Sequence, residues 1–243
     1  MSELDLSELD YASFWNRAFA AADPSWRRIP MGERTNRIVD LLVARRARVV
    51  LDLGCAIGRL SMRIAAAGIE VYGIDISEKA IEFALAWARD EGMPNVHFQV
   101  GSASNLLFPD ATFDAVVAIA LLDHMPLAEA QRAVREVRAV LKPQGLFVAS
   151  FDNPQGKEGH PYYAFPDGTR LYIRGPYRGL VWRPYTESEV RKLLVPFALH
   201  ELKQESDGSL TVIAQKPGIA PGTSDDSLGA ETGRTAETAA GNL

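Results

Sequence analysis

The chain alternates short apolar runs with segments in which apolar residues recur every three or four positions. Such runs are typical of buried strands, and the longer spacing is typical of helices that cover a sheet. Strands are predicted at 49–53, 72–75, 96–100, 113–120 and 146–151. Helices are predicted at 34–45, at 59–67, after the N-cap Ser77, and at 127–141. These repeats predict an α/β fold, with a doubly wound parallel sheet and helices on both faces.

The pattern changes after position 151, where Gly, Pro, aromatic and Arg residues become frequent. Within this insert, 152–184, the segment 165–169 lies between two aromatic runs and predicts a hairpin. Thr186 and Glu189 predict a capping box at a helix start. The runs 199–204 and 210–215 flank Asp207-Gly208 and predict a closing antiparallel hairpin.

Both ends of the chain differ from its middle. Residues 6–22 predict a helix with Tyr11, Phe14, Trp15 and Phe19 on related turns. From position 218 the chain is small, polar and without periodicity, which predicts disorder. We therefore expect an N-terminal helical segment at 1–33, a main domain at 34–217 and a disordered tail at 218–243.

Composition narrows the class of protein. The 243 residues suffice for one large α/β domain, and 47% hydrophobic with 23% charged residues is ordinary for a globular protein. The net charge of −5 argues against a broad nucleic-acid footprint. Cys55 is the only cysteine, so no intrachain disulfide is expected. The acidic start and the absence of an apolar run long enough to span a bilayer predict a cytoplasmic protein without membrane contact.

The segment 49–58 is a buried strand that ends in an acid, followed by a glycine-spaced turn and a helix start. Glycine lets the backbone of such a turn approach a ligand closely. A dinucleotide-binding fingerprint needs glycine at the positions of Ala56 and Arg59, so this reading of the turn is weak. A P-loop needs glycine and lysine at the positions of Arg59 and Leu60, so that reading fails. Asp75 ends the next strand, 21 positions after Gly54, about where a βαβ unit places a carboxylate on a ribose.

Asp52-Leu53-Gly54-Cys55-Ala56-Ile57-Gly58 resembles motif I of the class I S-adenosylmethionine (SAM) dependent methyltransferases, and Asp75 and the later strands agree in order. The resemblance covers about 34–215. It implies a Rossmann-like, mostly parallel seven-stranded sheet that closes in the C-terminal hairpin. It also implies SAM as cofactor and methyl transfer to a small-molecule acceptor.

By the same resemblance, the strand ends hold the cofactor. The backbone of Gly54, Cys55 and Gly58 would hold the methionine half of SAM. Asp52 would orient this loop or meet the cofactor's amino group through water. The other expected cofactor-binding residues are Asp75 for both ribose hydroxyls, Ile76 for the adenine face, Ser102 and Ala103 for the adenine edge, and Ala118, whose carbonyl would meet the methionine ammonium.

Three positions depart from the family pattern. Ala56 stands where the turn usually has glycine, which is tolerable if its φ angle is negative. Ser102 replaces a frequent aspartate, and Gln144 replaces a frequent glycine. These departures leave open a weak or non-catalytic SAM binder.

His124 follows the fourth predicted strand, at the sheet edge where ligands bind, and is the candidate catalytic base. The alternative is a histidine of the core or of a helix start, hydrogen-bonded to backbone. His160, in the insert, is a weaker candidate. The four histidines and the acids show no metal-ligand spacing, so no metal cluster is expected.

The insert is expected to shape the acceptor pocket, with aromatics that stack on a flat acceptor and arginines that hold a carboxylate or phosphate. The residues with these expected roles are Tyr162, Tyr163, Phe165, Tyr172, Tyr177, Trp182, Arg170, Arg174, Arg178 and Arg183. The alternative is a hairpin whose aromatics form their own small core and whose arginines face solvent. We expect most of these residues to follow this alternative and one or two to line the pocket. The N-terminal aromatic helix would be a lid over the cofactor or a helix packed at the sheet edge.

Three functions follow from the resemblance: a small-molecule methyltransferase acting at O, N or C, an RNA or protein methyltransferase with the insert as a stacking platform, and a SAM-binding protein without activity. The acidic charge and the lack of an Asn-Pro-Pro-Tyr type sequence after the fourth strand favour the first. The sequence carries no signal for an oligomeric state.

Overall fold

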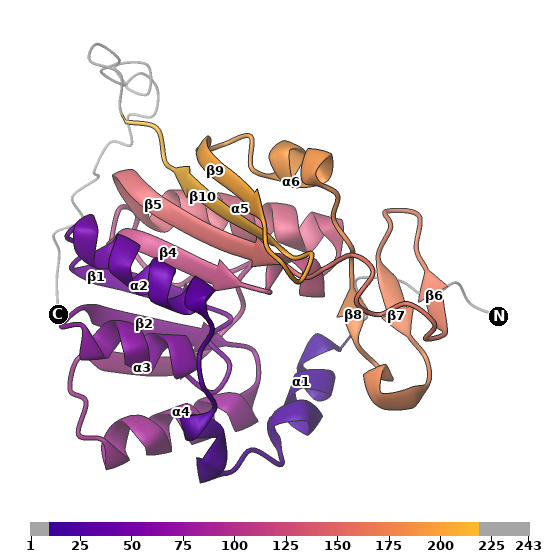
Figure 1. Ribbon diagram of the computed structural model, residues 1–243, viewed down its shortest axis with the longest axis horizontal. Helices are drawn as coiled ribbons and strands as arrows, with labels where there is room; N and C mark the ends of the chain where they lie inside the picture. The colour runs from indigo at the N-terminus through magenta and orange to yellow at the C-terminus, as the bar shows by residue number, and fades with distance from the viewer. Residues whose placement is uncertain (1–9, 219–243) are drawn as a thin grey trace, which may run out of the picture.

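The computed structural model describes residues 10–218, in which seven strands form one large sheet (Figure 1). Its strands are β1 (Val49–Leu53), β2 (Glu70–Asp75), β3 (Val96–Val100), β4 (Phe113–Ile119), β5 (Leu141–Phe151), β9 (Ala198–Gln204) and β10 (Leu210–Gln215). Their order is β3-β2-β1-β4-β5-β10-β9; the first five are parallel, and β10 runs antiparallel to both β5 and β9. The predicted mostly parallel sheet with its closing hairpin is confirmed.

Helices cover both faces of this sheet, as the apolar spacing predicts (Figure 1). One face carries α2 (Glu33–Ala44), α3 (Arg59–Ala66) and α4 (Glu78–Asp90), and the other carries α5 (Leu127–Val140) and α6 (Glu187–Leu193). β4 is buried on both faces, because helices from the two layers close over it. The sheet therefore separates two apolar cores and leaves its carboxyl edge for a site.

Local side-chain chemistry starts two of these helices where the sequence predicts. Ser77 accepts a hydrogen bond from the backbone N–H of Ala80 at the start of α4. Thr186 and Glu189 form the complete capping box of α6. Each arrangement pairs N–H groups that a helix start leaves without intrahelical partners.

The fifth strand differs from its prediction. β5 begins at Leu141, five residues earlier than expected, because Leu141 already pairs with Phe113. The register shifts before the next pair, Ala115 with Leu146, so the segment between forms an irregularity within the strand. Gln144 has a φ of 62° there, the left-handed conformation that glycine adopts at lower cost.

A second, three-stranded sheet lies beside the carboxyl edge of the large one (Figure 1). It contains β6 (Tyr162–Ala164), β7 (Arg170–Tyr172) and β8 (Val181–Trp182). The predicted hairpin is confirmed by the antiparallel pairing of β6 with β7, whereas β8 was not predicted, since two residues carry no periodicity. Tyr172, Leu180 and Trp182 form the buried core of this insert.

The N-terminal helix α1 (Tyr11–Phe19) lies between the two sheets (Figure 1). Phe14 and Trp15 pack against the core of the insert, and Asn16 accepts hydrogen bonds at the start of α4, so α1 contacts both the insert and the large domain. Asp10 caps α1 by accepting from the N–H of Ser13. The helix is shorter than the predicted 6–22, and positions 6–9 lie outside the described residues. Residues 10–218 also contain the short 3-10 helices η2 (Pro24–Arg28), η3 (Leu122–His124) and η4 (Gly175–Tyr177).

The predicted tail, 218–243, lies outside the described residues apart from Gly218. Among the helices between positions 10 and 218, none combines the length and the apolar character that crossing a bilayer requires.

Candidate active site

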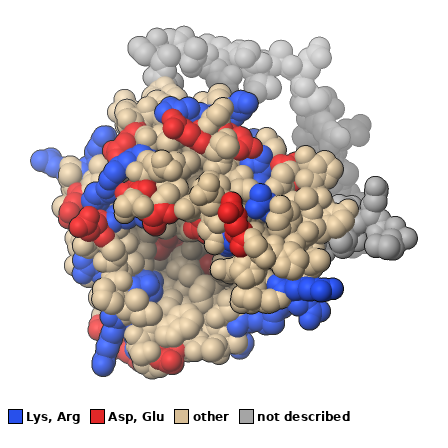
Figure 2. Space-filling model, turned by 45° about the vertical axis from the view of Figure 1, so that its right-hand side comes forward, with Lys and Arg blue, Asp and Glu red and all other residues tan. Residues whose placement is uncertain are grey.

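The carboxyl edge of the large sheet is hollowed on the face seen in Figure 2. A cavity of about 280 Å³ lies there, against the ends of β1, β2 and β4. Tyr11, Trp15 and Phe19 of α1 line its outer side, so the helix covers the cavity as the lid alternative describes. Its remaining walls come from the turns after the strands, including Gly54, Asp75 and the segment 101–104.

The turn after β1 presents bare backbone to this cavity. Gly54 has a φ of 73°, and a Cβ atom there would lie 2.8 Å from the side chain of Leu121. Asp75 holds the turn, since its two carboxylate oxygens accept the N–H groups of Ala56 and Ser77, each at 2.8 Å. Gly54 and Asp75 therefore open onto one cavity. Each carboxylate oxygen keeps acceptor capacity for a further donor, which fits a ribose hydroxyl.

Ala56 is tolerable in this turn if its φ angle is negative, and the structure does not meet that condition. Its φ is +50°, in the left-handed region, rather than negative. A side chain there costs about 1–2 kcal/mol relative to right-handed backbone. The Ala56 N–H donates to Asp75, and this hydrogen bond holds the turn although the residue is not glycine.

A second cavity, of about 950 Å³, lies on the other side of the same turn. It is lined by Asp52, Cys55 and Ile119, together with charged side chains of α2 and of the β9–β10 turn. Asp52 is 2% exposed and accepts a hydrogen bond from the Ser61 hydroxyl at 2.5 Å. Burial raises the pKa of Asp52 to about 7, while the Ser61 hydroxyl opposes that shift and the nearby Asp75 adds to it.

The other predicted cofactor residues divide into two groups. Ile76, Ser102 and Ala103 line the first cavity as expected. Gly58 and Ala118 do not line it. Gly58 is needed for packing, because a Cβ there would lie 2.6 Å from Phe98 and its φ is 84°. Ala118 is fully buried one position inside β4, and its successors Ile119 and Ala120 reach the cavity instead.

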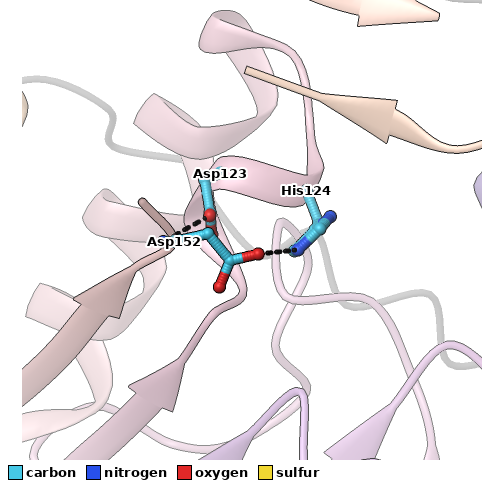
Figure 3. A group of neighbouring side chains, drawn as sticks. All are labelled: Asp123, His124 and Asp152. Atoms are coloured by element: carbon cyan, nitrogen blue, oxygen red, sulfur yellow. Dashed lines mark hydrogen bonds and ion pairs between the residues drawn. The ribbon is translucent and has the colours of Figure 1, made fainter. Parts of the chain in front are cut away.

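His124 lies on η3 and lines the first cavity (Figure 3). Its Nε2 atom lies 3.3 Å from Oδ2 of Asp152, which follows β5. Its Nδ1 atom is buried without a hydrogen-bond partner among the described residues. The ring of Trp15 packs edge-on against the imidazole, with the two ring centroids 5.1 Å apart. His124 is therefore oriented by a carboxylate rather than tied to backbone, and it keeps one free ring nitrogen.

Asp152 is the partner that the sequence analysis missed. The hydrogen bond from His124 and the ammonium of Lys157 hold the pKa of Asp152 well below its usual range. The sequence did indicate that Asp152 could lie near His124. Asp152 follows a predicted parallel strand, and the carboxyl end of that strand must lie beside the carboxyl end of β4.

The structure also brings together two acidic residues, Asp123 and Asp152, that are distant in the sequence. Asp123, His124 and Asp152 each bring one ligand-type atom within 4.8 Å of the others, although no cluster was expected (Figure 3). Sequence spacing could not indicate this, because Asp152 comes from a separate strand. The Lys157 ammonium, 2.8 Å from Asp152, already supplies a positive charge to this group, so we do not assign it as a metal centre.

The insert's polar residues do not reach the cavity. Arg183 is buried and bonds to Glu189 and to the Asp167 carbonyl, and Arg170 stacks on the Tyr162 ring. None of the insert arginines lines this cavity, whose charged and titratable lining residues are Asp75, Glu129, His124 and Tyr11, and the aromatics Tyr172 and Trp182 form a small core as the alternative describes. His160 packs against Tyr177 within the insert. Leu121 and Met125, which the sequence did not single out, do line the cavity.

A seven-stranded sheet in this order, with a bare glycine turn after β1 and a carboxylate at the end of β2, defines the class I SAM-dependent methyltransferases. Comparisons with known proteins agree. A family model described as "Methyltransferase domain" matches residues 50–145. A SAM-dependent methyltransferase structure from Methanosarcina mazei is 30% identical, with 70% of this chain and 93% of that chain covered and a TM-score of 0.60.

The chain belongs to this family, and its cofactor is SAM, as the sequence predicts. A protein structure from Pyrococcus horikoshii is 26% identical, covering 80% of this chain and all of that one, with a TM-score of 0.64. Among curated relatives, the 27-O-demethylrifamycin SV methyltransferase of Amycolatopsis mediterranei is 34% identical over 134 residues, 54% of this chain. That match spans 47% of the relative, so the chain covers about half the length of such proteins.

Proposed function

We propose that the protein transfers the methyl group of SAM to a small, uncharged or cationic acceptor that is largely apolar, at an O, N or C atom. The observation that carries the proposal is the shared cavity: the glycine turn, Asp75 and the imidazole of His124 line one space beneath an aromatic helix. Cofactor and acceptor would meet there away from bulk water.

The residues present fit SAM by their chemistry. Asp75 would accept the ribose hydroxyls, with Ile76, Ser102 and Ala103 around the adenine. The bare backbone at Gly54 would leave room for the methionine half, and buried Asp52 would face its ammonium from the neighbouring cavity. The sulfonium supplies an activated methyl group, so the protein's contribution is alignment and exclusion of water.

His124 would act as general base where the acceptor is a hydroxyl or amine. The Nδ1 atom lacks a partner among the described residues, and an acceptor O–H or N–H would supply one. SAM would supply the methyl group, its carbon–sulfur electron pair remaining with sulfur, and Nδ1 of His124 would take the proton that the acceptor loses. Asp152 would stabilise the resulting imidazolium through Nε2. This role is typically worth about 10²–10⁴-fold in rate.

The lining of the cavity sets the class of acceptor. Three aromatic rings of α1, with Leu121 and Met125, offer apolar contact. Neither lysine nor arginine lines the cavity among the described residues, whereas Asp75 and Glu129 do. An acidic acceptor would therefore lack a counter-charge and meet repulsion. The curated relative named for 27-O-demethylrifamycin SV supports a small-molecule acceptor. The cytoplasmic location expected from the sequence stays a prediction.

The first experiment is calorimetric titration with SAM of the wild type and of Asp75→Ala. Loss of the ribose acceptor and of the turn's anchor should weaken binding about 100-fold. Asp90→Ala, which removes an exposed acid of α4 paired with Arg27, should leave binding unchanged. Equal affinity in all three proteins would reject the cofactor site.

The second experiment measures transfer of radiolabelled methyl groups to small-molecule extract, RNA and protein. We expect labelling of the small-molecule pool, a loss of about 10²–10⁴-fold in His124→Gln, and normal rates in the control His200→Gln, whose histidine bonds to Gln215 on β10. Labelling of RNA or protein alone would favour the alternative substrates. Tight SAM binding with no labelled pool would favour a non-catalytic binder.

A further inference from the structure

We propose that a third cavity, remote from the first, binds an amphipathic anion: an apolar body that carries one carboxylate. The helices α2, α3 and α4 cover one face of the large sheet (Figure 1), and residues of these helices and of η2 line the cavity. Its volume is about 520 Å³, within the range of about 300–1,000 Å³ typical of small-molecule pockets. Among the described residues, none that lines it also lines the first cavity.

The apolar part of this cavity is adaptable. Three of the chain's five methionines line it, Met31, Met62 and Met93, together with the ring of Trp87. Methionine side chains are flexible and polarizable, so they can fit themselves around an apolar body. Ile29 adds a large apolar side chain that is 49% exposed. A ligand in the cavity would therefore cover apolar surface that now meets water.

The polar part of the cavity is mainly cationic. Arg27, Arg59 and Arg63 line it, and Glu91 is the single acid of that lining within residues 10–218. The chain as a whole has a net charge of −5, so this gathering of arginines is local. A guanidinium can hold a carboxylate through two parallel hydrogen bonds. The charges therefore favour an anion over a neutral or cationic ligand.

Two of these arginines have no carboxylate partner of their own. Arg59 donates to the backbone carbonyls of Ile29 and Pro30, and Arg63 donates to the amide oxygen of Asn36 at 3.1 Å. These acceptors are neutral, and neither arginine forms an ion pair within the described part of the chain. Each guanidinium has five N–H donors, so donors remain for a ligand carboxylate.

Arg27 is a fixed cation at the wall of the cavity. Its Nη1 atom lies 2.9 Å from Oδ2 of Asp90, and its guanidinium carbon lies 5.3 Å and 5.8 Å from the ring centroids of Phe83 and Trp87. Its Nε atom is buried without a hydrogen-bond partner among residues 10–218. A buried N–H without an acceptor is costly, and a carboxylate oxygen that reached it would remove this cost.

The first and third cavities differ in the charge that they favour. The acids Asp75 and Glu129 line the first cavity, and among the described residues neither lysine nor arginine does. An anion in the third cavity would therefore be a second ligand of the protein, distinct from the methyl acceptor. Arg59 also lines the 950 Å³ cavity beside the glycine turn, so this second ligand would lie one side chain away from that turn.

The test is calorimetric titration of the full chain with cinnamate, decanoate and the neutral cinnamamide, in the presence of saturating SAM. We expect one molecule of either carboxylate to bind, and cinnamamide to bind at least about ten-fold more weakly, because it lacks the charge. Arg63→Gln should weaken carboxylate binding about ten-fold. Ala66→Phe, which adds a ring at a lining position of α3, should abolish it.

Each variant has a matched control. Arg191→Gln removes an exposed arginine of α6 that pairs with Glu187, and Ala67→Phe adds the same ring one position beyond the lining residue. Both controls should bind the carboxylates as the wild type does. Titration with SAM checks that Arg63→Gln and Ala66→Phe fold, since neither residue lines the first cavity or the 950 Å³ cavity.

Three results would each overturn the proposal: no binding of either carboxylate to the wild type, equal binding of cinnamamide and cinnamate, or wild-type carboxylate affinity in both Arg63→Gln and Ala66→Phe. The titration decides the site whether or not a methyl acceptor is found.

Discussion

Replacing Asp52 with asparagine removes a buried carboxyl while keeping its shape and an oxygen for the Ser61 hydroxyl. Burial raises the pKa of Asp52 from 3.8 to about 7. The native protein therefore holds a proton that the unfolded chain releases between about pH 4 and pH 7. Stability falls as the pH rises through that window, because ionising the buried group in the native state costs free energy.

The size of this effect follows from the shift. One pH unit corresponds to about 1.4 kcal/mol, so a shift of about three units sets an upper limit near 4 kcal/mol. About one pH unit of this loss of stability is already present at pH 5. Between pH 5 and pH 8 the stability of Asp52→Asn should therefore gain about 2–3 kcal/mol relative to the wild type. At pH 5 the variant should therefore already be about 1.4 kcal/mol more stable than the wild type, and only below about pH 4 should the two proteins be similar.

Urea unfolding of both proteins without cofactor, at pH 5 and pH 8, measures this difference. Titration of the four histidines cancels, because both proteins contain them. Ser61→Ala offers a second variant: loss of the donor to the carboxylate should steepen the wild-type pH dependence. A stability gap between Asp52→Asn and wild type that stays constant from pH 5 to pH 8 would refute the reasoning.

Two glycine-turn substitutions should act in opposite directions, both measured as urea midpoints. Ala56→Gly relieves the left-handed strain at a φ of +50° and should stabilise the protein by about 0.5–1 kcal/mol after the entropy cost of glycine; a loss of stability would contradict this. Gly58→Ala introduces a Cβ 2.6 Å from Phe98 at a φ of 84° and should destabilise by about 2–4 kcal/mol; a wild-type midpoint would show that the packing argument is wrong.

Periodicity and turn chemistry predicted the large sheet because its strands are buried runs between helices with regular spacing. The shared cavity of Gly54 and Asp75 could also be predicted, since Gly54 follows β1 and Asp75 ends β2 within one βαβ unit. The pairing of His124 with Asp152 was missed, although the two residues follow neighbouring parallel strands whose carboxyl ends lie side by side. The contact of Lys157 with Asp152 was also missed: its ammonium lies 4.3 Å from the centroid of the Trp182 ring, and the two-residue strand β8 that holds Trp182 leaves no pattern in the sequence.

The small core that α1 shares with the insert makes the cover of the cavity a discontinuous unit. Phe14 and Trp15 pack on Tyr172 and Trp182, although well over a hundred residues separate them along the chain. A chimera that exchanges 152–184 with a relative, while retaining the native N-terminal helix, would pair surfaces that never evolved together. Redesign of this cover therefore has to transplant both segments as one piece.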